Sequence, residues 1–324
     1  MNTCHIYLFL SLALSPAAFS LLTGFDPKNL PMKSDPDAGQ TGYNRCGTTA
    51  KPNSLCQTLF INSAEDFCVF GPPKPLAVGE AERIAVAYCS KDGHGTRLIP
   101  PNTFTSMHYV RTPHYVQITA LGDVNQCPCS FIDLYSPKLT SHQTTKGEKW
   151  VSLSFWVSIP SSKSKSCVSR ILICVSTYSA DGHGNPIGGL VFGERGQFDR
   201  WTEFLAYDEL SIRACFNTDQ AYRYCEHIYD VEGSRWNMPG NYDTPGFDQC
   251  EGDDVPLPMG EYRRPDGSIY KWQRGSSPQP PPGTPGKLKT CKAYVVSKFF
   301  VRAPGATYSR SGRRSASPTT NIGS

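Results

Sequence analysis

Twelve cysteines lie beyond residue 20 of this 324-residue chain, and they constrain its fold more than any other feature of the sequence. The apolar run from Ile6 to Leu14, followed by the small residues around Ala18, predicts a signal peptide over residues 1–20. An even number of cysteines in an exported chain predicts disulfide bonds rather than free thiols. We therefore expect an extracellular fold in which cross-links restrict the unfolded chain.

Eight of these cysteines lie outside a central segment, residues 124–179, whose composition differs from that of its neighbours. The disulfide candidates are Cys46, Cys56, Cys68, Cys89, Cys215, Cys225, Cys250 and Cys291. Their pairing stays open at this point. Zinc thiolates are the alternative, but Cys127 and Cys129 have no matching second pair of close cysteines.

Short apolar runs broken by Gly and Pro predict a mainly β fold. The clearest runs are RIAVAY (83–88), YVQITA (115–120) and LVF (190–192), which are rich in β-branched and aromatic residues. The pattern favours one disulfide-rich domain over residues 50–275, sandwich or barrel-like, with one or two short helices. One helix is predicted over residues 218–228, because its apolar residues fall on one helical face.

The flanking segments differ from this domain in composition. Residues 21–49 are rich in Asp, Pro, Gly and Lys, which predicts a loose leader. Residues 276–286 predict an extended proline-rich spacer. Residues 287–324 carry Lys and Arg but no Asp or Glu, which predicts a basic, largely disordered tail with one strand over residues 293–301. The export signal argues against a nucleic-acid partner, and we expect no membrane span.

The central segment, residues 124–179, is basic and rich in Ser, whereas its neighbours on both sides are rich in Gly and Asp. Its apolar runs WVSLSFWVSI and RILICVSTY are typical of strands when taken alone. Because its composition matches neither flank, we interpret the segment as an atypical insert. The hypothesis is that part of it is intron sequence translated in frame.

The tetrapeptide DGHG occurs twice and supplies four candidate metal ligands: Asp92, His94, Asp181 and His183. If the two copies met in space, two imidazoles and two carboxylates would suit zinc, copper or manganese. Asp-Gly and Gly-His-Gly are also common turn sequences, because glycine adopts positive φ and aspartate bonds to its own turn. We favour two turns and expect no cofactor, with a divalent metal as the alternative.

The sequence offers no complete catalytic set. His94-Gly95-Thr96 is similar to the histidine turn of subtilisin-like proteases, but Ser106 follows too closely to lie on a separate helix. Glycoside hydrolysis needs two carboxylates that flank the bond, and no spacing selects such a pair. We therefore predict no catalytic residue.

Three aromatic residues, Trp201, Trp236 and Tyr242, are candidates for ligand binding. Together with Tyr262 they stand among Gly, Asn and Asp, which is the composition of a surface that stacks on sugar rings. Scattered aromatic residues are more often buried in the core, and core burial is the alternative to a ligand-binding surface here.

Six stretches taken together resemble a family of secreted basidiomycete proteins called macrophage-activating glycoproteins. They are INSAEDFCVFGPP (61–73), HGTRLIP (94–100), TPHYVQITALGD (112–123), GHGNPIGGLVFG (182–193), CEHIYDVEGSRWNMPGNYD (225–243) and FDQCEGD (247–253). The resemblance covers about residues 56–260 without the middle. It implies a fungal extracellular protein and no catalysis to carry over.

This chain departs from that family at two places. Family members reach the GNPIGG block through a shorter, acidic connector, which supports the intron hypothesis for part of residues 124–179. They also carry cysteine where this chain has Ser234. The second departure implies that one disulfide is missing or re-paired, and that Cys225 or Cys250 is free.

These observations favour a secreted, non-enzymatic binding or effector-like protein at the fungal cell wall or the host interface. The expected partners are fungal wall polysaccharide or a host extracellular protein. We expect any sugar of this glycoprotein to be O-linked on the Ser/Thr/Pro-rich tail. The alternative is a secreted carbohydrate-active or metal-dependent enzyme that uses the two DGHG turns.

Overall fold

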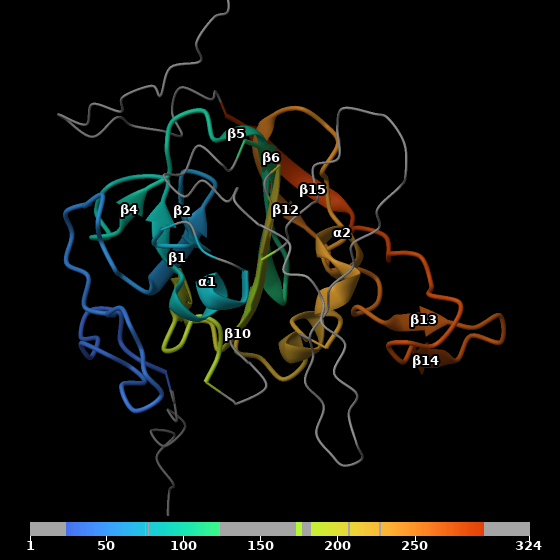
Figure 1. The fold of residues 1–324 in the computed structure, drawn as a ribbon. Coiled ribbons are helices and arrows are strands. Elements are labelled where there is room, and N and C mark those ends of the chain that lie inside the picture. Colours follow the sequence, from blue (N-terminus) through green and yellow to red (C-terminus); the bar gives the residue numbers. More distant parts are fainter. Residues whose placement is uncertain are drawn as a thin grey trace, which may run out of the picture.

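The computed structural model describes residues 24–74, 76, 78–123, 173–176, 183–206, 208–226 and 228–294. Strands dominate these residues, and two large sheets face each other as a sandwich (Figure 1). The expected mainly β, disulfide-rich fold with two short α-helices is confirmed. Within the described ranges, no helix is both long and apolar enough to cross a membrane.

One sheet has six strands. In spatial order they are β4 (Arg97–Leu98), β3 (Val86–Cys89), β2 (Asp66–Gly71), β1 (Thr58–Ser63), β8 (Leu190–Gly193) and β9 (Gly196–Gln197). β1 is antiparallel to β2 and parallel to β8. The parallel pair joins two parts of the chain that lie on either side of the central segment.

The facing sheet has seven strands. In spatial order they are β15 (Leu288–Ala293), β12 (Phe247–Gly252), β5 (Phe104–Arg111), β6 (Tyr115–Gly122), β11 (Glu209–Cys215), β10 (Arg200–Leu205) and β7 (Ile173–Ser176). β12 is parallel to β5, and the other neighbours are antiparallel. A separate hairpin consists of β13 (Glu261–Arg263) and β14 (Ile269–Lys271).

Aromatic contacts join the two sheets across the sandwich. The ring of Phe70 on β2 lies 5.1 Å from that of Trp201 on β10, and the ring of Phe67 lies 6.3 Å from that of Phe104 on β5. All four side chains are buried in one continuous apolar cluster. Burial of each such side chain contributes roughly 1.5–3 kcal/mol, so this interface holds the sheets together.

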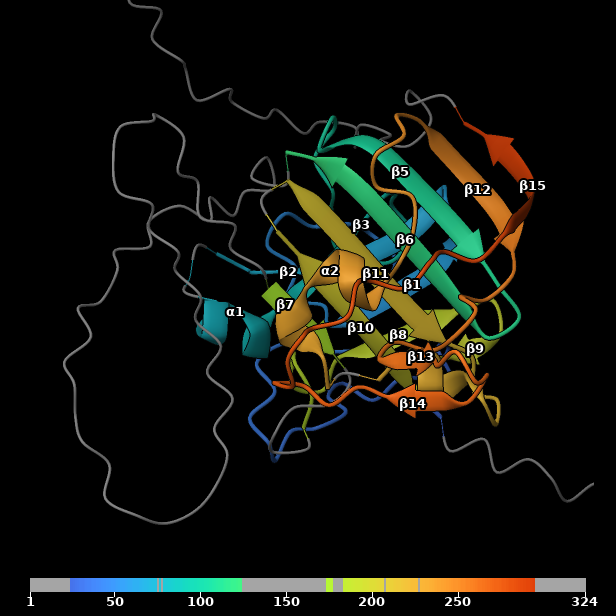
Figure 2. The same cartoon turned by 90° about the vertical axis from the view of Figure 1, so that its right-hand side faces the viewer.

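The other face of the seven-stranded sheet is buried as well, but its contacts are polar. Arg213 donates to Gln117 Oε1 (2.8 Å), and Thr119 donates to Asn241 O (2.6 Å). The cover is the chain after β11, which includes η2 (Ala221–Tyr224), η3 (Asp230–Glu232) and α2 (Ser234–Asn237). Figure 2 shows α2 lying over this face. Because both faces are covered, β6 is buried along most of its length.

The predicted strands 115–120 and 190–192 are present as β6 and β8. The strand predicted over residues 83–88 starts later, at Val86, because Arg83 and Ile84 end helix α1 (Val78–Ile84). Of the central segment, the structure describes β7, which pairs with β10. The intron hypothesis therefore concerns residues that lie mostly outside the described chain.

The helix predicted over residues 218–228 is wrong in type and length. A single 3-10 turn, η2, stands there instead. The disulfide between Cys215 and Cys225 closes a segment of ten residues with its Cα atoms 6.1 Å apart, so the chain must return to β11 after one turn. The predicted apolar face is also divided, since Ala221 is buried and Tyr222 is exposed.

All eight candidate cysteines are paired. The disulfides are Cys46–Cys56, Cys68–Cys89, Cys215–Cys225 and Cys250–Cys291. The expectation that Cys225 or Cys250 is free is therefore wrong. Ser234, which implied a missing bridge, is buried and its hydroxyl lies 2.7 Å from that of Ser211.

The leader is not loose where the structure describes it. Leu30, Gln40 and Asn44 are buried. Asn44 Nδ2 donates to Gly188 O at 2.9 Å, and Ser34 Oγ donates to the same carbonyl at 2.7 Å. Polar side chains of the leader thus donate hydrogen bonds to a backbone carbonyl in the turn that precedes β8. Composition alone does not reveal such long-range hydrogen bonds.

The chain after residue 275 also belongs to the domain. Residues 276–286, here called the proline-rich strap, run from the β13–β14 hairpin toward β15, and in Figure 2 this part of the chain passes across α2. β15 extends the sheet beside β12 and is held by the Cys250–Cys291 disulfide. The structure has a strand at residues 288–293, whereas the strand expected over residues 293–301 lies mostly outside the described chain, as do residues 295–324.

Candidate functional site

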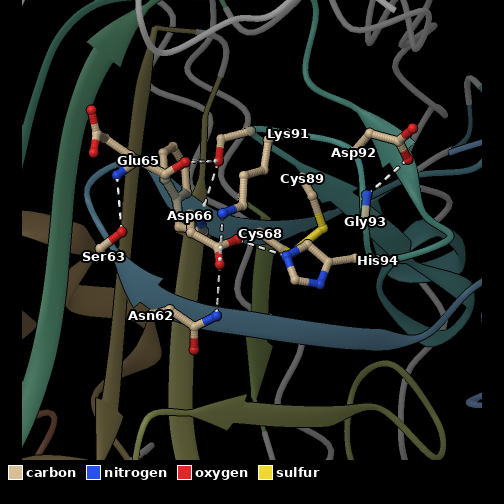
Figure 3. A network of polar contacts seen from close by, with 12 residues as sticks. Asn62, Ser63, Glu65, Asp66, Cys68, Cys89, Lys91, Asp92, Gly93 and His94 are labelled. Atoms are coloured by element: carbon tan, nitrogen blue, oxygen red, sulfur yellow. Dashed lines mark hydrogen bonds and ion pairs between the residues drawn. A yellow bond between two sulfur atoms is a disulfide. The ribbon is translucent and has the colours of Figure 1, made fainter. Parts of the chain in front are cut away.

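The first DGHG turn places His94 in a polar network beside the six-stranded sheet (Figure 3). His94 Nε2 donates to Asp66 Oδ1 at 2.6 Å, and its ring stacks on Phe60 with centroids 4.5 Å apart. The neighbouring Cys68 and Cys89 form a disulfide, so they supply no thiolate. The arrangement positions an imidazole and a carboxylate without a cysteine nucleophile.

Asp66 is the centre of this network. Besides His94 it contacts Asn62 Nδ2 at 2.9 Å and Lys91 Nζ at 3.2 Å. Partial burial favours the neutral acid, but the contacts with His94, Asn62 and Lys91 outweigh it and lower the pKa of Asp66 to about 2. Asp66 is therefore a carboxylate at any physiological pH, and its charge is stabilised by these three side chains.

The rest of the turn is held by its aspartate and its glycines. Asp92 Oδ1 accepts from the backbone N–H of Gly93 (2.8 Å) and of Ala50 (2.7 Å). Gly95 adopts φ +65°, and a Cβ there would lie 2.0 Å from Cys46 O. Asp92 thus closes the turn, as in the interpretation of DGHG as turn chemistry.

The second DGHG turn uses a different carboxylate. His183 Nδ1 donates to Asp35 Oδ2 at 2.8 Å, while Asp181 lies outside the described residues. Each imidazole therefore has its own aspartate. In the part of the chain that the structure describes, no group of three or more His, Cys, Asp or Glu side chains is placed to hold a metal ion.

The three aromatic candidates do not form an open sugar-stacking surface, because each is buried. Trp201 packs inside the sandwich against Phe70. Tyr242 lies under α2, where its hydroxyl donates to Met238 O at 2.9 Å. Trp236 alone reaches a cavity near the surface, and it is 6% exposed.

That cavity has a volume of about 160 Å³ and is bounded by α2, the loop before β13 and the proline-rich strap. Its lining includes Trp236, Pro239, Leu257, Met259, Tyr262 and Thr284. We call the cavity and the aromatic side chains beside it the aromatic groove. Ligand sites of this kind are mostly apolar with a few placed polar groups.

The wall of the aromatic groove is a cluster of rings. The ring of Trp236 lies 5.0 Å from that of Tyr229 and 5.6 Å from that of Trp272. On the hairpin, the rings of Tyr262 and Tyr270 are 5.7 Å apart. Such contacts favour one fixed arrangement of the rings, so the wall is formed in advance of any ligand.

Charge in the aromatic groove is largely compensated. Glu261 accepts two hydrogen bonds from Arg223 Nη2, at 2.6 and 2.8 Å. Burial, with Tyr270, Tyr229 and Glu232 nearby, raises the pKa of Tyr262 to about 12. Tyr262 thus remains a neutral hydrogen-bond donor at physiological pH, and the aromatic groove suits an uncharged ligand that offers acceptors.

Comparison with known proteins identifies the family. The chain is 35% identical over 295 residues to the appressorium protein ROW2 of Mycosarcoma maydis, and the match covers 87% of each chain. This chain belongs to the ROW2 family. The appressorium protein ROW1 of the same fungus is 39% identical over 223 residues, which cover 66% of this chain and 44% of ROW1. No family model and no solved structure matches the chain.

The ROW relatives come from a basidiomycete, so the expected fungal family is confirmed at that level. Within this ROW protein, sequence reasoning selected Trp236 but missed Tyr229, Met259 and Trp272, which complete the cluster. The available signal was the density of aromatic residues before the proline-rich strap, over residues 229–272. Strand and turn patterns do not show which of them converge.

Proposed function

We propose that this protein is a non-enzymatic extracellular binding protein that acts at the fungal surface where the fungus meets its host. The observation that carries the proposal is the match to ROW2 along 87% of both chains, since ROW2 is named for the appressorium. Four disulfides and the predicted signal peptide support secretion. The macrophage-activating glycoprotein label and O-glycosylation of the tail belong to the same proposal.

The chemistry of the domain supports binding rather than catalysis. The two DGHG imidazoles face separate aspartates, and the cysteines beside His94 are oxidised. The aromatic groove, by contrast, combines an apolar wall with the donor groups of Trp236 and Tyr262. Fungal wall polysaccharide and host extracellular protein are the partner classes that we propose.

A retention experiment tests this function. Purified, oxidised protein is passed over β-glucan, chitin and immobilised host extracellular proteins, and the bound fraction is measured. We expect retention on at least one surface and less retention for a variant with Trp236→Ala, with Trp201→Phe as a control inside the sandwich. Loss of infection-structure function on gene deletion, restored by the wild-type gene, is the matching result in the fungus. Absence of retention on every surface would contradict the proposed binding function.

A further inference from the structure

Two aromatic side chains of the aromatic groove hold the proline-rich strap by its backbone. Trp236 Nε1 donates to Pro280 O at 3.0 Å, and Tyr262 OH donates to Pro281 O at 3.0 Å. A proline-rich segment has no internal hydrogen bonds, so its carbonyls are free to accept such donors. Aromatic-lined grooves recognise proline-rich peptides in this manner. The strap is thus bound as a ligand of that class would be bound.

The strap is a surface layer and not part of the core. Its residues are exposed except for Pro280 and Gly286, which are half-buried. Gln279 adds a hydrogen bond to Glu232, and beyond the strap Asp253 N donates to Lys287 O at 2.9 Å. The connection from Lys271 to Leu288 is longer than most loops without secondary structure, and such loops commonly have a function.

The aromatic wall does not depend on the strap for its shape. Tyr229 OH donates to the backbone carbonyl of Trp272 at 2.7 Å, which fixes the Tyr229 ring to the chain that carries Trp272. Close ring contacts and Met259 complete the cluster below the strap. Removal of the strap would therefore expose a formed site with two donors, Trp236 Nε1 and Tyr262 OH, that have lost their acceptors.

The strap also leaves part of the aromatic groove unfilled. The cavity of about 160 Å³ continues beyond Pro280 and Pro281, between the loop around Leu257 and the strap residues Gly283 and Thr284. A peptide that makes the strap's two hydrogen bonds and also fills this space would bury more apolar surface than the strap does. Burial of additional apolar surface strengthens binding by roughly 25 cal/mol per Å².

We infer that the aromatic groove is a binding site for proline-rich segments of extracellular proteins, and that the protein's own strap occupies it in cis. The inference deepens the proposed function, on which it rests, by naming the partner class. The tether gives the strap an effective concentration of the order of millimolar at the aromatic groove. A competing peptide therefore binds only if its affinity exceeds that of the strap or if the strap has left the groove. The free protein is therefore self-occupied.

The test uses a strap variant, P280S/P281S/P282S, and a fluorescent peptide with the strap sequence SSPQPPPGTPG. The control variant is P285S, since Pro285 is exposed and makes neither aromatic hydrogen bond. In fluorescence anisotropy we expect the strap variant to bind the peptide about tenfold more tightly than wild type or P285S. A peptide with alanine in place of every proline should not bind.

Tyr262 provides the second arm of the test. Tyr262→Phe in the strap variant removes one donor and is expected to weaken peptide binding about fivefold. The matched control is Tyr222→Phe, because Tyr222 is exposed and does not line the aromatic groove. Equal binding by the strap variant and wild type, or no effect of Tyr262→Phe, would overturn the inference.

A further measurement covers the case in which the strap variant does not fold. Isotope-labelled wild-type protein is titrated with millimolar peptide, and the indole N–H signal of Trp236 is followed by NMR. We expect this signal to shift with the proline-rich peptide and to stay in place with the alanine peptide. An unmoved signal contradicts the inference.

The outcomes separate this inference from the proposed function. Retention of the protein on chitin, β-glucan or host proteins without peptide binding refutes the inference and leaves the proposed function standing. Peptide binding without retention on any surface supports the aromatic groove as a peptide site. The same result counts against the proposed function at the fungal cell wall or host interface. A concentration-dependent dimer of the strap variant, measured by light scattering, would assign the site to the strap of a second copy and overturn the extracellular partner.

Discussion

Glu203 is a carboxyl group inside the apolar core of the sandwich. It is fully buried on β10, and its Oε2 accepts from Phe70 N at 2.9 Å. Among the described residues, Oε1 has no hydrogen-bond partner. Burial raises the pKa of Glu203 well above its usual range, although the bond from Phe70 opposes the shift. The side chain is therefore a neutral acid over part of the pH range in which exposed glutamates are charged.

The first prediction concerns the pH dependence that Glu203 imposes. With a folded pKa above the ordinary 4.5, the native state holds a proton that the unfolded chain releases, so stability falls as pH rises above 4.5. Glu203→Gln should remove this fall and gain about 1–3 kcal/mol on wild type between pH 4 and pH 7. Urea unfolding at both pH values measures it, with Glu65→Gln as an exposed control. Parallel profiles for wild type and Glu203→Gln would refute the assignment.

Ser211 and Ser234 occupy a position suited to an additional disulfide. Both are buried, their hydroxyl oxygens are 2.7 Å apart, and Tyr242 OH lies 3.1 Å from that of Ser234. The second prediction is that S211C/S234C forms a disulfide on oxidation. A bridge of this span should add about 3 kcal/mol to the free energy of unfolding.

Intact mass and thiol titration measure the bond, and unfolding with and without reductant measures its effect. The single variants S211C and S234C are the controls. Two free thiols in the oxidised double variant would show that the serine pair cannot reach disulfide geometry.

At the scale of elements, β15 depends on a cross-link more than on burial. All of its residues are exposed, and it pairs only with β12 in the described chain. Its Cys291 bonds to Cys250, which is buried on β12. The edge strand and the end of the strap are therefore held to the sandwich chiefly by backbone pairing and this disulfide.

The third prediction follows from that attachment. C250S/C291S should lower the free energy of unfolding by about 4 kcal/mol, because the disulfide closes a segment of 41 residues. Hydrogen exchange should speed up in β15 before it does in β6, which lies in the middle of the sheet. C215S/C225S is the comparison, since its shorter loop predicts a smaller loss. Unchanged exchange in β15 would contradict this account.

The elements that sequence patterns predicted are those with uniform burial. β6 is buried over its first six residues and β8 over its first three, and their β-branched and aromatic residues are visible in YVQITA and LVF. The failures lie where long-range partners decide the structure. The segment after β11 is set by Cys215–Cys225, and the leader is ordered by contacts with Gly188. The aromatic groove was equally hidden, because Trp236 and Tyr262 meet through the strap and not through local spacing.

At the scale of the whole molecule, three ionisable groups favour a mildly acidic medium. Asp66 contributes stability above pH 3.8, which is lost as pH falls toward its folded pKa of about 2. Burial of His108 opposes its protonation, but Asp248 at 2.9 Å and Thr244 O at 2.8 Å raise its pKa above 6.5. The contribution of His108 is therefore complete below pH 6.5 and is lost as pH rises through the raised value.

The fourth prediction is that the melting temperature is highest between about pH 4 and 6. Glu203 reduces stability as pH rises above 4.5, His108 adds to this decline above pH 6.5, and Asp66 reduces stability below pH 3.8. Calorimetry from pH 2 to 9 measures the profile. In the double variant E203Q/H108Q the melting temperature should fall much less at high pH. In Asp66→Asn its fall at low pH should be absent. A melting temperature that is highest above pH 7 in the wild type would refute these assigned roles of Glu203 and His108.

The spacing of the disulfides along the chain sets an order for oxidative assembly during synthesis. Cys46–Cys56 and Cys215–Cys225 each span ten residues, so they can close soon after their second cysteine is synthesised. β1 must wait for β8, and Cys250 must wait for Cys291. Because chains emerge from the amino terminus onward, Cys250–Cys291 is the last of these four bridges that can form. A chain that stops before residue 291 would carry an unpaired thiol at Cys250.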